Sequence, residues 1–398
     1  MENKDMFYGG DNVKELPVAN IVVAGITGAG KSTLVNAVFG RDLAETGQGK
    51  AITEHMAEYY NAGSPICIWD TVGLEIDAAK TEKSIRDIKK KIEEKAMSHN
   101  EKDYIHAIWY CINSGSNRYQ EGEIRFISEL HKLKVPFIIV LTQCTDDPEV
   151  IDSFEAVIRN ENKKRELEDI DIIQVLAEDK KTRLGTIEKF GLEELVNATT
   201  DKMPDYLSAS FIAAQNVCRE NKRTECEKII LNYVKQSMNG TWDNIWLINI
   251  PATNEKIKQL LIEISMMYKQ IINEDELILE VAKFDLNFEN IWNGLIVPWQ
   301  GEYGKKVQDM FEKKVGGGYE GDFVELPKNY KAARLIAYYG CIFIDSVEET
   351  WDDYNNKKIE NIKKYVDELI KNINNNLKKG AKNNKNLIIK KGEMYGEY

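Results

Sequence analysis

The apolar run 17–24 leads directly into a glycine-rich turn, and a segment with helix-forming character follows the turn at once. The turn reads Gly25-Ile26-Thr27-Gly28-Ala29-Gly30-Lys31-Ser32, which fits the pattern G-x-x-x-x-G-K-[ST]. With average residue frequencies, a chance match in a chain of this length is roughly a one or two per cent event. Because the motif joins an apolar strand to a helix, this part of the chain is expected to be an α/β fold.

Further apolar segments recur up to about residue 204, with helical segments between them. They are 66–69, 106–112, 135–141 and 172–176, and a shorter strand is expected at 56–60. Nearly continuous apolar strands separated by helices indicate a mostly parallel sheet with helices on both faces.

Helical periodicity dominates the chain after Pro204. Two stripes step by three and four residues: Ile257, Leu260, Leu261, Ile264, Tyr268 and Ile271, and then Ile359, Ile362, Val366, Leu369, Ile373 and Leu377. Such a stripe more often docks on its own domain than forms a coiled coil. We therefore predict an N-terminal extension (1–16), an α/β domain (17–204) and an all-α domain (205–398) with a basic tail.

Composition restricts the classes of partner. The formal net charge is −12, which disfavours broad binding to nucleic acid. Residues 355–398 carry eleven Lys against five Asp or Glu, a local charge of +6. We interpret this tail as a solvated helix face and a disordered end; contact with an acidic partner or an anionic lipid surface is the alternative, so any membrane contact is expected to be peripheral.

The compartment is predicted from the N-terminus and the cysteines. Residues 1–12 are polar and lack an apolar core, so no secretory signal is expected. No stretch approaches about 20 uninterrupted apolar residues, so no transmembrane helix is expected. The six cysteines show no C-x-x-C pair, which is typical of reduced, buried thiols. These features predict a cytoplasmic protein without a zinc site.

The glycine-rich turn has the chemistry of a phosphate-binding loop. Glycines let the backbone N–H groups close around phosphate oxygens, and the helix N-terminus adds partial positive charge. Lys31 would neutralise the β- and γ-phosphates, Ser32 would bind Mg2+, and Thr33 would reach the α-phosphate. The expected phosphate-binding residues are Thr27, Gly28, Ala29, Gly30, Lys31, Ser32 and Thr33. The alternative is a glycine-rich turn without a ligand.

A second marker, Asp70-Thr71-Val72-Gly73, follows the strand 66–69. The Asp70 carboxylate could hold Mg2+ through its hydration shell, and the Gly73 N–H could contact the γ-phosphate. Between the two motifs, the polar segment 46–53 is expected to be a mobile loop. Thr53 is our candidate for a further ligand of Mg2+ and the γ-phosphate, with Thr46 as the alternative.

Together, Lys31, Thr53 and Asp70-Thr71-Val72-Gly73 resemble the motifs of GTPases of the TRAFAC class of P-loop proteins. The stretch from His106 through Arg118 and Glu123 to Gln143 is similar to Era-like GTPases and to the septin and AIG branches. The resemblance covers about residues 17–200 and implies a G domain that hydrolyses GTP with Mg2+. It assigns Lys31, Thr53 and Gly73 to catalysis; the helical half is only faintly similar to the domains that follow such G domains.

The base-recognition motif departs from the family pattern. A standard [NT]KxD would begin at Thr142, but Gln143 replaces the lysine that packs on the base, and Asp146 lies one residue late. A carboxylate that pairs with guanine N1–H and the 2-amino group selects guanine, so Asp146 can do so if the loop bulges. The resemblance also places Ala177 and Glu178 in the last GTPase motif, where the backbone N–H of Ala177 would contact the guanine oxygen. These residues favour GTP and GDP over adenine nucleotides.

Leu74 stands where Ras-like enzymes have a glutamine that orients the attacking water. Slow hydrolysis is therefore expected from the chain alone, with a partner, a second copy, a bound ion or Gln48 supplying the missing group. The expected function is a nucleotide-dependent switch that acts through the helical domain on a protein partner or a second copy. The alternatives are dynamin- or septin-like assembly with membrane association, and a non-hydrolysing scaffold or ATPase.

Overall fold

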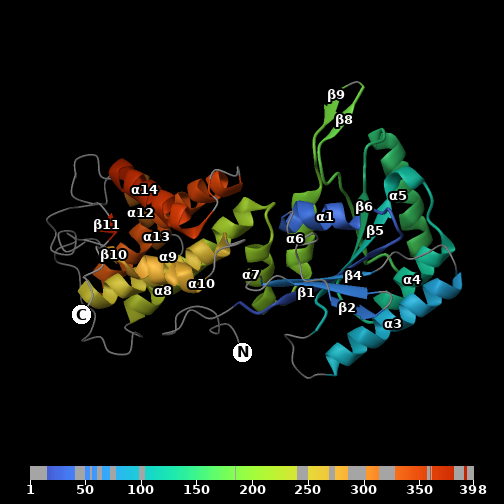
Figure 1. Ribbon diagram of the computed structural model, residues 1–398, viewed down its shortest axis with the longest axis horizontal. Coiled ribbons are helices and arrows are strands. Elements are labelled where there is room, and N and C mark those ends of the chain that lie inside the picture. The colour runs from blue at the N-terminus through green and yellow to red at the C-terminus, as the bar shows by residue number, and fades with distance from the viewer. Residues whose placement is uncertain are drawn as a thin grey trace. The chain divides into compact units, whose positions relative to one another are not determined.

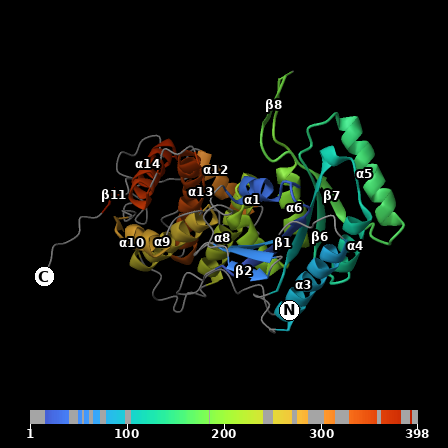
Figure 2. The same cartoon turned by 45° about the vertical axis from the view of Figure 1, so that its right-hand side comes forward.

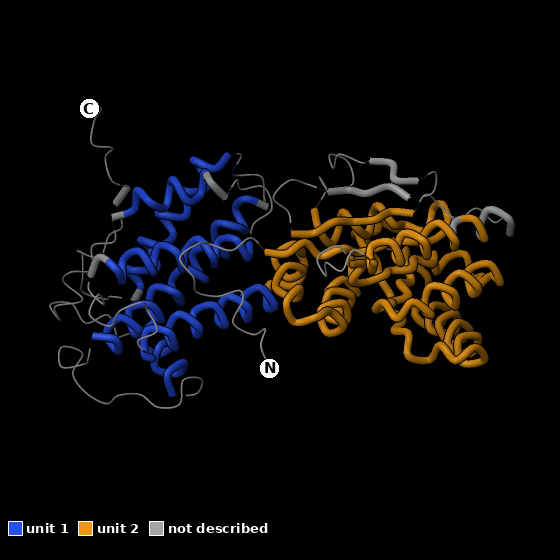
Figure 3. The backbone as a smooth tube through the Cα atoms, turned by 90° about the horizontal axis from the view of Figure 1, so that it is seen from below, with its two compact units in different colours: residues 1–15, 220–398 blue, residues 16–219 orange. Residues whose placement is uncertain are grey.

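The computed structural model describes residues 16–40, 50–53, 56–60, 65–71, 78–97, 104–183, 185–239, 250–268, 274–285, 302–312, 328–355, 359, 361–380 and 390–391. These residues belong to two compact units (Figure 3). One unit spans residues 16–219, and the other spans 220–398 together with 1–15.

Seven strands form the sheet of the first unit, in the order β2-β3-β4-β1-β5-β6-β7. They are β1 Ala19–Gly25, β2 Lys50–Thr53, β3 Met56–Tyr60, β4 Ile66–Thr71, β5 Ala107–Asn113, β6 Phe137–Thr142 and β7 Asp171–Gln174. The five strands from β4 to β7 run parallel, whereas β2 and β3 are antiparallel to their neighbours. The predicted, mostly parallel sheet is confirmed (Figure 1).

Two layers of helices cover this sheet (Figures 1 and 2). Helices α3 Ala78–Ala96, α4 Glu121–His131 and α5 Pro148–Lys163 pack on one face and share a hydrophobic core with the strands. Helices α1 Lys31–Phe39, α6 Leu192–Lys202 and α7 Asp205–Ala214 form a second core on the other face. A hairpin of β8 Lys180–Thr182 and β9 Gly185–Ile187 extends away from the sheet.

Helix α7 belongs to the sheet-containing unit, although the sequence analysis divided the chain at 204/205. Its residues Leu207 and Phe211 are fully buried against this sheet. The ring of Phe211 packs edge-on against Trp109 of β5, at 6.4 Å between centroids, and the Asn216 N–H donates to the Val38 carbonyl at 2.7 Å. The compact unit therefore continues to Arg219.

The segment 46–53, expected to be a mobile loop, is partly a strand. Its last four residues form β2, which pairs with β3 in a register that brings Thr53 opposite Met56. Residues 46–49 lie outside the described residues. The prediction was wrong for 50–53 because the glycine-rich composition of 46–49 dominated the pattern, and antiparallel pairing with β3 was not visible from sequence.

The second unit consists of helices α8 Arg219–Asn239, α9 Ile250–Met267, α10 Glu274–Ala282, α12 Glu302–Met310, α13 Lys328–Asn355 and α14 Ile362–Gly380, with a two-residue pairing of β10 Phe284–Asp285 and β11 Lys390–Lys391. Its α9 stripe is buried from Ile257 to Tyr268, and Ile271 lies outside the described residues. The α14 stripe docks on α13: Asn372 and Asn376 donate to Thr350 at 3.1 Å and to Ser346 at 3.0 Å. The predicted docking within one domain is confirmed.

Helix α13 is the central apolar element of the second unit. Its segment 332–343 is buried apart from the half-buried Arg334, so it forms part of the core of this unit. No helix in the described part of the chain is long and apolar enough to cross a bilayer. The six cysteines are all buried and free, as predicted.

Candidate nucleotide-binding site

The glycine-rich loop lies at the carboxyl end of β1, between that strand and α1. Gly25 has a φ of 145°, and a Cβ there would lie 2.4 Å from the Cys111 carbonyl oxygen, so only glycine fits. Gly28 and Gly30 also have positive φ values, 83° and 80°. The loop therefore needs glycine for its own conformation, and α1 begins directly after it at Lys31.

The Lys31 side chain folds back over this loop. Its ammonium donates to the carbonyl oxygens of Gly25 at 3.0 Å and Ile26 at 3.3 Å. The residue is only 9% exposed. Because the loop carbonyls hold this cation in place, its charge is already positioned beside the N-terminus of α1.

Asp70 lies near the end of β4, the neighbour of β1. Its Oδ1 is buried and has no hydrogen-bond partner among the described residues. Burial raises the pKa of this carboxyl to about 6, and the nearby Lys31 charge opposes the rise. A buried carboxylate oxygen without a donor fits a hydrated divalent cation, which would supply donors from its water shell. The exposed Ser32 lines the same cavity.

The loop after β6 is tied to the phosphate-binding loop. The Thr142 hydroxyl donates to the Ala29 carbonyl at 2.6 Å and lies 3.2 Å from that of Ile112. Gln143, whose φ is 55°, donates from its side-chain amide to the Gly28 carbonyl at 2.9 Å. Gln143 stands where the family pattern has a lysine, and its amide holds the neighbouring loop.

The base end of the cavity is formed by two loops. After β6, Thr145 and Asp146 line it, and Asp146 is exposed. After β7, Ala177 and Glu178 line it from the other side. The Cys144 N–H donates to the Val175 carbonyl at 3.3 Å, which joins the two loops. Between these two loop contacts, Gln143 has a left-handed backbone.

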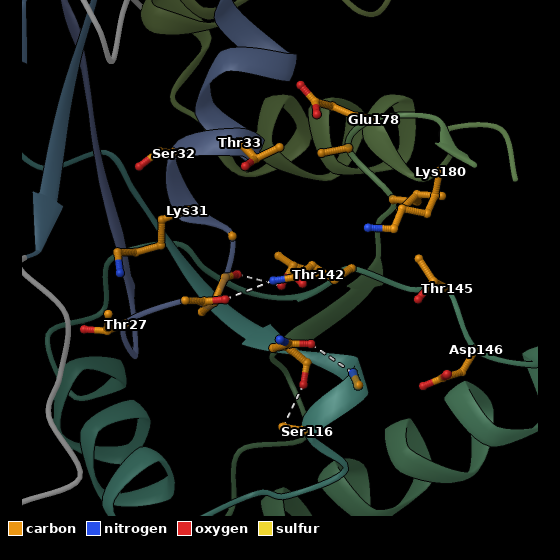
Figure 4. Close-up of a pocket in the computed structure, with 18 of the residues that line it drawn as sticks. Thr27, Lys31, Ser32, Thr33, Ser116, Thr142, Thr145, Asp146, Glu178 and Lys180 are labelled. Atoms are coloured by element: carbon orange, nitrogen blue, oxygen red, sulfur yellow. Dashed lines mark hydrogen bonds between the residues drawn. The ribbon is translucent and has the colours of Figure 1, made fainter. Parts of the chain in front are cut away.

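One cavity of about 1040 Å³ joins these elements (Figure 4). Its lining includes these predicted site residues: Thr27, Gly28, Ala29, Gly30, Lys31, Ser32, Thr33, Asp70, Thr142, Gln143, Asp146, Ala177 and Glu178. Of the remaining predicted residues, Thr53 is described only by its backbone in β2, and Gly73 lies outside the described residues, as do Gln48 and Leu74.

Eight further residues of the lining were not predicted from the sequence. The additional residues are Thr71, Asn113, Gly115, Ser116, Thr145, Leu176, Asp179 and Lys180. The run Asn113–Ser116 carried a usable signal, because a small polar turn follows a buried strand there, and ligands bind at the carboxyl ends of parallel strands. No motif marks Lys180.

Residues 20–143 match the family model described as 50S ribosome-binding GTPase. Interferon-gamma-inducible GTPase 10 from Mus musculus is 28% identical over 141 residues, which are 34% of this chain and 30% of that protein's length.

Two solved structures are also similar. A probable GTP-binding protein engB is 18% identical, with a TM-score of 0.34 over 46% of this chain and 98% of that one. Toc33 from Arabidopsis thaliana, in a dimerisation-deficient mutant form, is 20% identical, with a TM-score of 0.33 over 47% of this chain and 84% of that one.

The fold and the site define residues 16–219 as a P-loop nucleotide-binding domain. Within this domain, residues 20–143 match the 50S ribosome-binding GTPase family, so the domain is similar to P-loop GTPases. Guanine nucleotide binding, typically with Mg2+, is the property of that family.

Proposed function

We propose that this protein binds GTP and GDP with Mg2+, hydrolyses GTP slowly by itself, and acts as a nucleotide-dependent switch through its helical unit. One observation supports this most strongly: a single cavity joins Lys31 and Asp70 to Asp146. A cation and an unpartnered carboxylate oxygen suit a metal-bound polyphosphate, and an exposed carboxylate suits the amino edge of guanine. The finer assignment to an Era-like, septin or AIG branch stays a prediction.

The phosphate end supports the binding half of the proposal. The N–H groups of residues 28–33 would contact phosphate oxygens, and Lys31 would neutralise the β- and γ-phosphates. Ser32, Thr53 and Asp70 would hold Mg2+, which neutralises charge on the phosphate oxygens when bound. The buried, unpartnered Oδ1 of Asp70 is the feature of this chain that fits such an ion.

The chemical step is attack of water on the γ-phosphorus. The bond to the β,γ-bridging oxygen breaks, and GDP and inorganic phosphate leave. Lys31 stabilises charge on the bridging and γ-oxygens, while the backbone of Gly73 and the hydroxyl of Thr53 contact the γ-phosphate. Leu74 carries no group that could orient water. The isolated chain should therefore turn over slowly until a partner or a second copy completes the site.

Loss of the γ-phosphate would release the contacts of Thr53 and Gly73, and this change is the proposed switch. The partner is a protein or a second copy of the chain; nucleic acid is disfavoured by the net charge of −12. A cytoplasmic location is part of the proposal, since six free thiols fit a reducing compartment. Any membrane contact would be peripheral, through the basic tail.

The test is equilibrium binding of fluorescent GTP, GDP and ATP with Mg2+. The wild type is compared with Lys31→Ala and with Lys132→Ala, which removes an exposed lysine at the end of α4. Guanine binding that is lost only in Lys31→Ala, with ATP ignored, is expected. Preferred or equal binding of ATP contradicts the guanine assignment, and no binding contradicts the proposal as a whole.

A second measurement separates a switch from an assembly protein. Gel filtration is carried out with GDP and with a slowly hydrolysed GTP analogue. With the analogue bound, the protein is expected to form at most a dimer. Large oligomers in the analogue, or flotation with anionic liposomes, favour dynamin- or septin-like assembly instead. Guanine binding without measurable phosphate release, even at high protein concentration, favours a non-hydrolysing scaffold.

A further inference from the structure

The root of the β8–β9 hairpin is fixed at the base end of the cavity. Leu176 and Phe190 exchange two backbone hydrogen bonds of 3.1 Å. The Asp179 carboxylate accepts from the Lys189 N–H at 2.9 Å. Gly191 follows the hairpin, and a Cβ at this position would lie 1.8 Å from the Gln174 carbonyl oxygen, so only glycine fits there. The residue that begins β8 therefore has a defined place on the rim of the site.

That residue is Lys180, and it lines the cavity. In Figure 4 its side chain runs from the hairpin with the amine pointing toward the middle of the labelled side chains, on the side of Thr145. The amine makes no hydrogen bond or ion pair with any other residue that the structure describes. The adjacent Lys181 is also exposed but does not line the cavity, because side chains alternate along a strand.

Three side-chain donors at the end of β6 and in the loop after it are already committed to the protein. The Thr142 hydroxyl donates to Ala29 and the Gln143 amide to Gly28. The Cys144 thiol lies 3.3 Å from the Leu141 carbonyl, to which it donates. At this end of the described cavity, the Lys180 ammonium is the charged donor without such a commitment.

We infer that Lys180 is a specificity-determining residue that donates a hydrogen bond to O6 of guanine. The inference rests on the proposed function, in which a guanine nucleotide occupies this cavity. Asp146 would accept from N1–H and the 2-amino group, so the two side chains would pair with opposite ends of one base edge. Adenine carries an amino group in place of O6. Because that amino group cannot accept a hydrogen bond from an ammonium, Lys180 also disfavours binding of adenine.

The experiment uses the full-length chain and four diphosphates. GDP has both O6 and the 2-amino group, IDP keeps only O6, 2-aminopurine riboside diphosphate keeps only the amino group, and ADP has neither. Lys180→Ala should weaken GDP and IDP by a similar factor, roughly fivefold to tenfold, as expected for a charge-assisted hydrogen bond at a partly exposed site. Binding of the 2-aminopurine nucleotide, which has no O6, should not change.

Two control variants sharpen the comparison. Lys181→Ala removes the same charge from the same strand, away from the cavity, and should leave all four affinities unchanged. Asp146→Ala should weaken GDP more than IDP, because IDP lacks the 2-amino group that Asp146 would bind. Lys180 is assigned to O6 if Lys180→Ala weakens GDP and IDP equally, whereas Asp146→Ala weakens GDP more than IDP.

Three results overturn the inference. Lys180→Ala without effect on GDP removes the contact altogether. An equal loss for all four nucleotides assigns the ammonium to ribose or phosphate. A wild type that binds no guanine nucleotide contradicts the proposed function and this inference together, whereas the first two results leave guanine binding by the wild type intact.

Discussion

The side-chain amide of Gln143 donates to the carbonyl of Gly28 at 2.9 Å, across 115 residues of sequence. With the hydrogen bond from Thr142 to Ala29, it fastens the loop after β6 to the phosphate-binding loop. Both loops lie at the carboxyl ends of parallel strands, where ligands of such sheets bind. Thr142 and Gln143 therefore hold the two loops of the cavity together.

Removing the Gln143 bridge should weaken nucleotide binding without unfolding the domain. Gln143→Ala is expected to raise the Kd for GDP roughly threefold to tenfold, because one neutral hydrogen bond contributes about 0.5–1.5 kcal/mol. Gln143→Lys keeps a donor for the Gly28 carbonyl and should retain most of the affinity. Gln143→Glu places an acceptor against that carbonyl and should lose the most. Equal affinities in all three variants, measured by titration with fluorescent GDP, contradict the bridge.

Asp70→Asn should uncouple nucleotide binding from Mg2+. In the wild type, millimolar Mg2+ is expected to tighten GDP binding, since the unpartnered carboxylate oxygen would hold the hydrated ion. In the variant, the factor by which Mg2+ tightens GDP binding should be at least about tenfold smaller, because a neutral amide attracts the ion less than a carboxylate does. In EDTA the variant should bind GDP slightly more tightly than the wild type, because a negative charge near the phosphates is gone.

The quantity to compare is the ratio of the Kd in EDTA to the Kd in Mg2+, measured for the variant and for the wild type. General damage to the site changes both Kd values of the variant and leaves its ratio unchanged. If Mg2+ tightens GDP binding in Asp70→Asn as much as in the wild type, Asp70 does not hold the ion. A variant that has lost affinity equally with and without Mg2+ points to misfolding of the loop.

The elements of the fold that depend on short sequence patterns were predictable from the sequence. The strand 19–25 is entirely buried, and its apolar run and final glycine gave its position within two residues. Helix α7 was different, because Pro204 followed by Asp205 is typical of the start of a new helix in any domain. Only the packing of Leu207 and Phe211 on the sheet shows which unit holds it.

The same limit applied to the candidate site. The residues from Thr27 to Thr33 carry a motif whose spacing reflects the shape of a phosphate group, so sequence found them. Lys180 carries no motif, since its place depends on a hairpin root set by the pairing of Leu176 with Phe190. The bond from Gln143 to Gly28 joins two motifs that a sequence shows only separately.

In the helical unit, Arg223 of α8 is bound by two carboxylates of α13. Its guanidinium donates to Asp345 at 2.8 Å and to Glu348 at 3.2 Å. Arg223→Met should destabilise this unit by about 2–4 kcal/mol, because the buried Glu348 and the half-buried Asp345 lose a shared cation. Lys235→Met changes an exposed lysine of the same helix and should cost under about 0.5 kcal/mol. Hydrogen exchange of α8 and α13 peptides measures both, and similar protection in the two variants contradicts the role given to Arg223.

A partly buried acid should make the stability of the helical unit depend on pH. Glu263 of α9 accepts from the Tyr233 hydroxyl at 2.6 Å, and burial raises the pKa of its carboxyl to about 7 from 4.5. Between these pKa values the folded chain holds a proton that the unfolded chain has released. Stability should therefore fall as pH rises from 4.5 to 7, by about 3 kcal/mol in total, and then stay level.

Glu263→Gln should remove this dependence, since an amide can still accept from Tyr233 but does not titrate. At pH 8 the variant should be more stable than the wild type, whereas at pH 5 the two should differ little. Glu255→Gln, at an exposed position of the same helix, changes the same charge in water and serves as the control. Hydrogen exchange of α8 and α9 peptides, corrected for intrinsic rates at each pH, reports the free energy of opening. If Glu263→Gln and the wild type keep the same slope between pH 5 and 7, the carboxylate is already charged in the folded unit and the argument from burial fails.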